Sequence, residues 1–166
     1  HFGREGRGVV MVRSSGNNRA LLVNANDNGY ANDVRVVSVG AVRGDGRPAS
    51  YSTPGACLLL ATPSGDPENA TPGLFTTDLT GTSGASTQSD GTDSNNYTIF
   101  NGTSAAAPLV AGIAALLFEA RPDLTYRDVQ QILLNSARQA QPSLPGVRTN
   151  QAGYLVSHDT GFGVPD

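Results

Sequence analysis

The sequence has few of the residues that mark several common protein classes. Cys57 is its single cysteine, so an intramolecular disulfide is excluded, and cysteine usage does not distinguish an oxidising from a reducing compartment. The 11 lysine and arginine residues are fewer than the 14 acidic residues, and the formal net charge of −3 provides no basic field for a nucleic-acid partner. Only two histidines are present, which leaves few candidates for a catalytic base.

Long hydrophobic runs and targeting segments are scarce as well. The longest apolar run, residues 105–118, contains Pro108 and is expected to be too short to span a membrane. The first eight residues, HFGREGRG, contain no apolar signal-peptide core. We therefore expect no membrane partner. The 166 residues suffice for one domain with a buried core, and we expect them to be part of a longer protein.

Three short apolar runs predict the strands of an α/β protein. Residues 8–12, 34–42 and 57–63 are rich in Val, Leu or Ala and are bounded by Gly, Asn, Asp or Pro, which is typical of buried strands in a mainly parallel sheet. From 64 to 96 the chain consists mostly of turn-forming residues, which predicts a long loop. Its low-complexity part, residues 80–95, is interpreted as a mobile surface loop. Loops of this length inside a domain are usually functional.

Two helices are predicted in the last third of the chain. The first carries large apolar residues at helical spacing with small residues on its other faces, so we expect it to be buried nearly all round. The large residues are Leu109, Ile113, Leu116 and Leu117. Pro122 should end this helix near Arg121. The second helix is expected to begin at Thr125, where Asp128 three residues later forms a variant of the capping box.

Ser104 lies where the first helix begins, in the segment NGTSAAAP. A helix N-terminus carries partial positive charge and unpaired N–H groups. A serine there either caps the helix or acts as a nucleophile whose oxyanion those groups stabilise. Pro108 is tolerated in the first turn, and the small residues around Ser104 leave room for a substrate backbone. Serine caps are common, so the local sequence by itself favours a cap. A cap needs no such room, however, and Pro108 with the small residues shifts the balance toward the nucleophile, so both interpretations stay open at this point.

These segments resemble the subtilisin-like serine proteases. Residues 101–120 are similar to the reactive-serine segment Gly-Thr-Ser-x-x-x-Pro and its helix, most closely in the kexin/furin-like branch. Residues 13–18, RSSGNN, are similar to the strand end that bears the oxyanion-hole asparagine, and YLVSHDTGFGVPD is similar to the hairpin and Gly-rich turn of that branch. The resemblance implies a subtilisin-like α/β fold, a mainly parallel sheet with helices on both faces. Residues 1–166 would form the C-terminal part of one catalytic domain.

The resemblance also implies roles for individual residues. Ser104 is expected to be the nucleophile of a serine endopeptidase that works through an acyl-enzyme. The side-chain amide of Asn17 is expected to bind the oxyanion together with the backbone N–H of Ser104, supported by Thr103. Ser15 and Gly16 are expected to form one wall of the pocket for the substrate residue before the cleaved bond. This chemistry requires no cofactor, and the substrate is a protein or peptide.

The catalytic base is missing from this set of residues. In the resembling family the Asp and His precede the Ser in chain order. His1 lacks the His-Gly-Thr context of the family base, and His158 lies in the terminal hairpin. We therefore expect an upstream half of the catalytic domain to supply Asp and His, and this chain alone to be inactive. Two alternatives remain: a non-catalytic binding or assembly module with the subtilisin fold, and a different serine hydrolase that uses a local His.

The expected specificity pocket departs from the resembling branch. Kexin-like enzymes cut their substrates after paired basic residues. The pocket of these enzymes contains an acidic residue directly before a Gly-Tyr pair, which meets the positive charge of the substrate, and a calcium site lies near the pocket. Here Asn28 precedes Gly-Tyr, while Val23 and Thr53 occupy the two calcium-ligand positions. A pocket lined by Asn28 should admit neutral residues more readily, although the adjacent Asp27 could restore basic selectivity. Structural calcium would then have ligands largely outside this chain.

Other partners follow from the resemblance alone. They are a propeptide, inhibitor or chaperone protein and a downstream β-sandwich domain, with no nucleic acid and no membrane. The resemblance implies a secreted or extracytoplasmic location.

Overall fold

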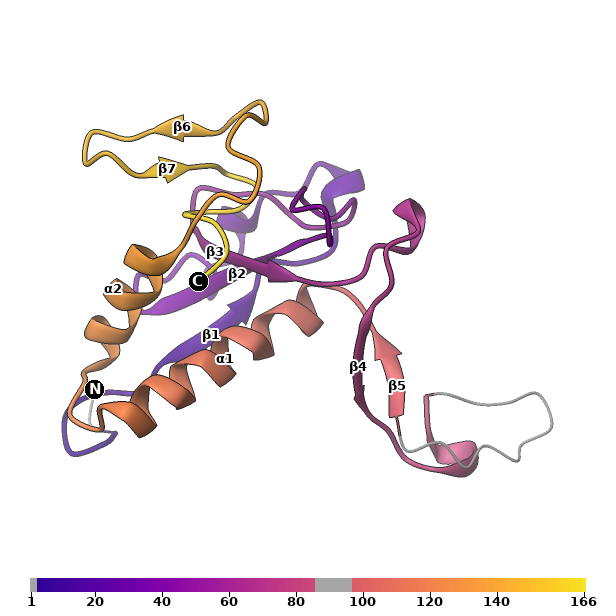
Figure 1. The fold of residues 1–166 in the computed structure, drawn as a ribbon, viewed down its shortest axis with the longest axis horizontal. Coiled ribbons are helices and arrows are strands. Elements are labelled where there is room, and N and C mark those ends of the chain that lie inside the picture. The colour runs from indigo at the N-terminus through magenta and orange to yellow at the C-terminus, as the bar shows by residue number, and fades with distance from the viewer. Residues whose placement is uncertain (1–2, 86–96) are drawn as a thin grey trace.

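The computed structural model describes residues 3–85 and 97–166, and its centre is a three-stranded parallel sheet (Figure 1). The strands are β1 (Met11–Ser14), β2 (Val36–Val42) and β3 (Leu58–Pro63), in the order β1-β2-β3. All seven residues of β2 are buried, as expected for the central strand of a parallel sheet. The three predicted strands are thus confirmed. Strand β1 begins at residue 11, whereas the prediction placed its start at residue 8. Gly8 has a positive φ of 80° and belongs to the turn that precedes the strand.

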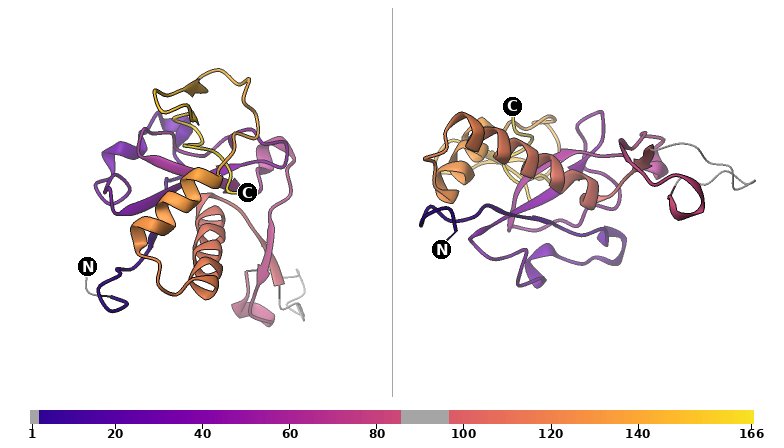
Figure 2. Two further views of the ribbon diagram at one scale, coloured as in Figure 1. Left: turned by 60° about the vertical axis from the view of Figure 1, so that its left-hand side comes forward. Right: turned by 90° about the horizontal axis from the view of Figure 1, so that it is seen from below.

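Two α-helices pack on the sheet. Helix α1 (Thr103–Ala120) contacts all three strands, and α2 (Tyr126–Ser136) contacts β3 (Figure 2). Alternating residues of β2 meet small or branched residues of both helices in one core. Its members include Val37, Val39, Ala41, Ala106, Val110, Ala114, Val129 and Leu133. The predicted capping box of α2 is present: Thr125 Oγ1 accepts the N–H of Asp128, and the Asp128 carboxylate accepts the N–H of Thr125.

The prediction that α1 is buried nearly all round is wrong for the described residues. Leu116 is 64% exposed and Leu109 39% exposed, whereas Ala106 and Val110 are fully buried. The helix rests on the sheet by its small residues, because these allow its backbone to come close. The apolar run 105–118 was expected to be too short to span a membrane. The helix that contains it, α1, has 18 residues and is long and apolar enough to cross a membrane by length and composition alone, so this expectation is wrong. Its contacts with three strands are those of a core helix.

The segment predicted as one long loop, residues 64–96, contains a strand that pairs with another strand directly after the segment. Strands β4 (Leu74–Thr77) and β5 (Tyr97–Phe100) pair antiparallel and project away from the sheet (Figure 1). Residues 86–95 of the low-complexity segment lie outside the described residues, as does His1. A shorter hairpin pairs β6 (Arg148–Thr149) with β7 (Leu155–Val156). Strand β7 lies within residues 154–166, where a hairpin was expected, and β6 lies before them.

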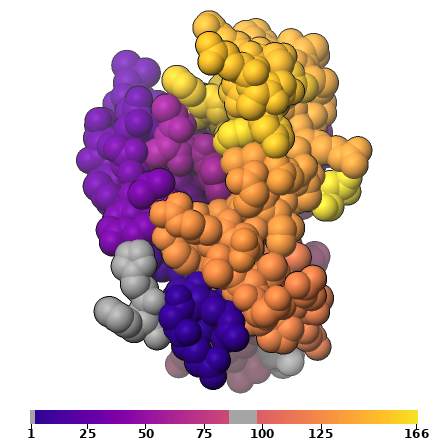
Figure 3. All heavy atoms as spheres, turned by 90° about the vertical axis from the view of Figure 1, so that its left-hand side faces the viewer, coloured from indigo at the N-terminus to yellow at the C-terminus, as the bar shows by residue number. Residues whose placement is uncertain are grey.

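Short 3-10 turns lie in the segments that connect the strands. The turns are η1 (Arg19–Leu21), η2 (Ala25–Asp27), η3 (Pro67–Asn69) and η4 (Gly81–Ser83). The described residues nearest the N-terminus, 3–8, lie beside the connection between α1 and α2 (Figure 3), where Arg4 donates hydrogen bonds to the carbonyls of Pro122 and Leu124.

Candidate active site

Ser104 is the second residue of α1 and is exposed at its N-terminus. The N-cap position is occupied by Gly102, whose φ of 94° favours glycine. Ser104 is therefore not the cap of this helix. Neither its hydroxyl nor its backbone N–H has a hydrogen-bond partner among the described residues, so both are available to a ligand at the mouth of the helix.

Asn17 reaches the same helix N-terminus from the end of β1. Its Oδ1 accepts two hydrogen bonds from Thr103, one from the backbone N–H at 2.9 Å and one from Oγ1 at 2.8 Å, across 86 residues of sequence. A backbone N–H can only donate, so the atom facing it must be the amide oxygen. The amide nitrogen Nδ2 lies beside Gly102, 3.2 Å from where a Cβ atom would stand. No hydrogen bond of Nδ2 is found among the described residues, so its protons remain available as donors next to the N-cap of α1.

The loop around Asn17 is fixed by two buried threonines. Thr103 Oγ1 accepts the N–H of Gly16 at 3.3 Å, and Thr53 Oγ1 accepts the N–H of Asn18 at 2.9 Å. The N–H of Thr53 donates in turn to the carbonyl of Gly16. Ser15 is buried next to this loop, and its hydroxyl has no partner in the part of the chain that the structure describes. The structure thus brings together Ser15, Gly16, Asn17, Thr103 and Ser104.

A second group of side chains binds the backbone of the N-cap residue Gly102. Tyr51 Oη accepts the N–H of Gly102 at 3.1 Å and donates to the carbonyl of Gly65. Ser64 Oγ donates to the carbonyl of Gly102 at 3.1 Å. Sequence reasoning missed Tyr51 and Ser64 as parts of the site, and it named Thr53 only at a calcium-ligand position of the resembling branch. The available signal was the concentration of hydroxyl side chains in ASYST and TPS, next to β3.

Asp66 anchors this second group. It is fully buried, and its carboxylate accepts hydrogen bonds from the N–H and hydroxyl of Ser50 and from the amide of Asn69. Burial raises the pKa of Asp66, but these hydrogen bonds and the charge of Arg43 outweigh it, and the pKa is lowered overall. Asp66 is therefore held as a carboxylate that fixes the residue before Tyr51.

Asn28 is not brought into contact with Ser104. It is exposed at the end of η2, and its Oδ1 accepts the N–H groups of Tyr30 and Ala31 at 3.0 and 3.1 Å. Asp27 is exposed beside it. The role of Asn28 in a specificity pocket stays a prediction.

The positions expected to bind calcium in the resembling branch do not fit the metal. Thr53 is buried and hydrogen-bonded to the Asn17 loop, and Val23 offers an apolar side chain. Calcium prefers several oxygen ligands that include carboxylates. Among the described residues, no group of three or more His, Cys, Asp or Glu side chains is arranged to hold a metal ion. Calcium held by other ligands stays a prediction.

His158 does not form a catalytic pair with Ser104 in the described residues. It is exposed in the turn after β7, and its carbonyl accepts the N–H of Gly55. No hydrogen bond joins its imidazole to Ser104 within residues 3–85 and 97–166. The geometry gives no support to a hydrolase that uses this histidine.

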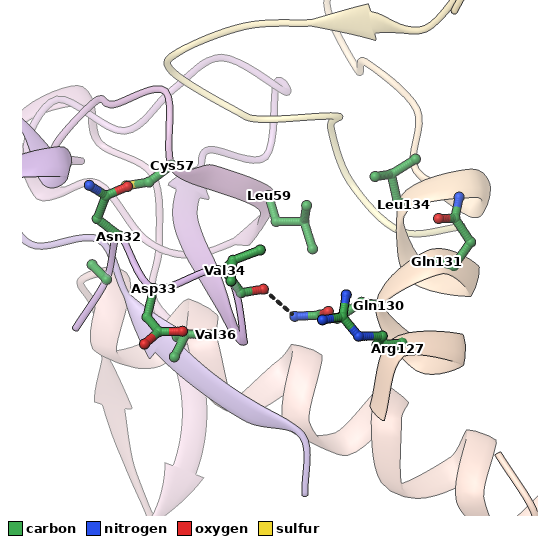
Figure 4. A pocket seen from close by; sticks show the side chains of 11 residues that line it. Asn32, Asp33, Val34, Val36, Cys57, Leu59, Arg127, Gln130, Gln131 and Leu134 are labelled. Carbon is green, nitrogen blue, oxygen red and sulfur yellow. Dashed lines mark hydrogen bonds between the residues drawn. The ribbon is translucent and has the colours of Figure 1, made fainter. Parts of the chain in front are cut away.

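A cavity of about 490 Å³ lies at the other end of the sheet, between α2 and the N-terminal ends of β2 and β3 (Figure 4). Asp33, Val36, Cys57 and Arg127 are among its lining residues. Asn17 follows the C-terminal end of β1, and parallel strands share their C-terminal edge. The cavity therefore lies at the opposite end of the strands from Asn17 and Ser104. Burial raises the pKa of the Cys57 thiol.

Comparison with known proteins identifies the family of this chain. The model of the Subtilase family matches residues 2–163. Proprotein convertase subtilisin/kexin type 7 of Mus musculus is 39% identical over 162 residues, which are 98% of this chain and 20% of that protein. The type 4 convertase of the same organism is 37% identical over 99% of this chain and 23% of its own length.

Solved structures show the same fold. The serine protease of Aeromonas sobria, crystallised with its chaperone, superposes with a TM-score of 0.81 at 24% identity, over 95% of this chain and 35% of that protease. This chain therefore spans about a fifth of the convertases and about a third of the bacterial protease. Because the family model covers nearly the whole chain and a convertase is 39% identical to it, the chain belongs to the subtilase family.

Proposed function

We propose that this chain carries the nucleophile and oxyanion-hole half of a subtilisin-like serine endopeptidase. The observation that carries the proposal is the fixed orientation of Asn17. Thr103 binds its amide oxygen with two hydrogen bonds, so its amide nitrogen is held next to the N-cap residue Gly102, two residues before the exposed Ser104. A fixed donor next to a nucleophile is the arrangement that acyl transfer requires.

The reaction follows from these positions. Ser104 Oγ attacks the carbonyl carbon of the substrate peptide while its proton passes to a base, and the carbonyl oxygen becomes an oxyanion. Asn17 Nδ2 and the N–H of Ser104 donate to that oxyanion, and the positive end of α1 stabilises its charge. When the C–N bond breaks, the amine leaves with the proton and an ester remains on Ser104. Water then hydrolyses the ester and regenerates the hydroxyl.

The base belongs, in this proposal, to an upstream half of the same catalytic domain. Two observations support this. The described residues place no histidine beside Ser104, and this chain corresponds to only a part of each related protease. The incomplete burial of α1 leaves apolar surface, including Leu109 and Leu116, for further parts of the domain.

Substrate and partners are proposed from the relatives. A protein or peptide substrate fits the serine-protease family, and the convertase relatives are named for processing proproteins. The Aeromonas sobria protease forms a complex with a chaperone, which supports a chaperone or propeptide as a partner here. We extend this to secretion or export of the mature enzyme and to a downstream β-sandwich domain.

Labelling with a fluorophosphonate tests the proposal. The complete catalytic domain should be labelled at Ser104, and the Ser104→Ala variant should not. Residues 1–166 alone should be labelled far more slowly, because an unactivated serine is a weak nucleophile. Equal labelling of both proteins would overturn the assignment of the base to the upstream half. Absence of labelling in the complete domain would overturn the proposed function itself.

A further inference from the structure

Thr53 holds both neighbours of Asn17. Its Oγ1 accepts the N–H of Asn18 at 2.9 Å, and its N–H donates to the carbonyl of Gly16 at 2.9 Å. Thr53 is only 1% exposed. A Cβ atom on Gly16 would lie 3.0 Å from Thr53 Oγ1, and the φ of Gly16 is 110°. Glycine is thus required where the loop rests on this threonine.

Thr53 is itself part of a rigid segment. Ser52 Oγ accepts the N–H of Ala41 in β2, and the carbonyl of Ser52 accepts a hydrogen bond from Arg19 Nε at 2.8 Å. The guanidinium of Arg19 also pairs with Asp159. The bond from Ala41 holds Ser52 and Thr53 against the central strand β2. Thr53 therefore fixes the loop that carries Asn17 relative to the sheet.

The two threonines act on different parts of Asn17. Thr103, on α1, binds the amide oxygen and sets the rotation of the side chain, and its Oγ1 also accepts the N–H of Gly16 at 3.3 Å. Thr53, next to the sheet, binds the backbone on both sides and sets where the side chain begins. Removing the Thr53 hydroxyl would leave the N–H of Asn18 without its acceptor and release one side of this loop.

We propose that Thr53 is a positioning residue for the oxyanion donor Asn17. The proposal rests on the proposed function, because it acts only through the donor role of Asn17. A displacement of a catalytic group by about 1 Å can cost on the order of a hundredfold in rate. Loss of a single supporting hydrogen bond should cost less, and we expect kcat to fall about tenfold with KM changed less than about twofold.

The test compares three variants of the complete catalytic domain. Thr53→Val keeps the shape and removes the hydroxyl, whereas Thr53→Ser keeps the hydroxyl and should restore most of kcat. Thr160→Val is the matched control, since it removes a buried hydroxyl that bonds Gln139 in the C-terminal region. Active-site titration with a fluorophosphonate normalises kcat to the folded, labelled fraction. If Thr53→Val does not fold, Thr53→Ala compared with Thr53→Ser replaces it.

Combination with Asn17→Ala separates positioning from general stability. If Thr53 acts through Asn17, Thr53→Val should lower kcat little further once the amide is absent. An equal fall in kcat in both backgrounds would overturn the proposal, as would an unchanged normalised kcat in Thr53→Val. Both results require a wild type that cleaves peptides and is labelled at Ser104. A wild type that does neither refutes the proposed function and, with it, this role of Thr53.

Discussion

Replacement of Asn17 by Asp separates its two hydrogen-bonding roles. The Asp carboxylate still accepts both bonds from Thr103, but it has no N–H to offer an oxyanion. Asn17→Ala removes both roles and leaves two donors of the buried Thr103 without a partner. The pair of variants therefore distinguishes a loss of catalysis from a loss of structure.

The expected magnitudes follow from these contacts. Loss of one oxyanion donor, as at the asparagine of a subtilisin, lowers kcat on the order of a hundredfold to a thousandfold, or about 3–4 kcal/mol. Both variants should show a fall of at least this size. At about 1 kcal/mol for each hydrogen bond, Asn17→Ala should also lower the free energy of unfolding by about 1–3 kcal/mol. Asn17→Asp should leave it nearly unchanged.

Steady-state kinetics with a peptide substrate and urea denaturation of the complete catalytic domain provide the readouts. We expect kcat to fall in both variants with KM nearly constant, and stability to fall only in Asn17→Ala. An Asn17→Asp variant with near-wild-type kcat would refute the donor role. A rise of KM alone would make Asn17 a substrate-binding residue instead.

Three further outcomes are expected. Tyr51→Phe removes the acceptor of the Gly102 N–H and should lower the free energy of unfolding by about 1–2 kcal/mol; an unchanged denaturation midpoint would contradict the contact. The lowered pKa of Asp66 stabilises the fold above its unfolded pKa of about 3.9, and this contribution should be lost as pH falls through the folded pKa. In thermal melts between pH 6 and pH 2, the melting temperature of the wild type should fall more steeply with falling pH than that of Asp66→Asn. Equal slopes of melting temperature against pH in the two proteins would contradict this contribution of Asp66. Because Asn28 is neutral, peptide-library profiling should find cleavage after neutral residues; cleavage restricted to Lys or Arg and lost in Asp27→Ala would show the opposite.

The sequence by itself determined the elements that depend on short-range signals. The apolar runs of β2 and β3 predict buried parallel strands because a strand covered on both faces needs no polar alternation. The capping box of α2 is encoded within four residues, from Thr125 to Asp128. The segment around Ser104 indicated a nucleophile because small residues surround a serine at a helix N-terminus. Each signal lies within one turn or one strand.

The tertiary structure decided the contacts that join distant segments. The orientation of the Asn17 amide depends on Thr103, 86 residues away, and the loop beneath it depends on Thr53, 35 residues away. The pairing of β4 with β5 and the exposed face of α1 were also not visible in local patterns. Periodicity reports which residues are apolar, but not which neighbour covers them. A side chain becomes a positioned donor only when the fold brings its partners to it.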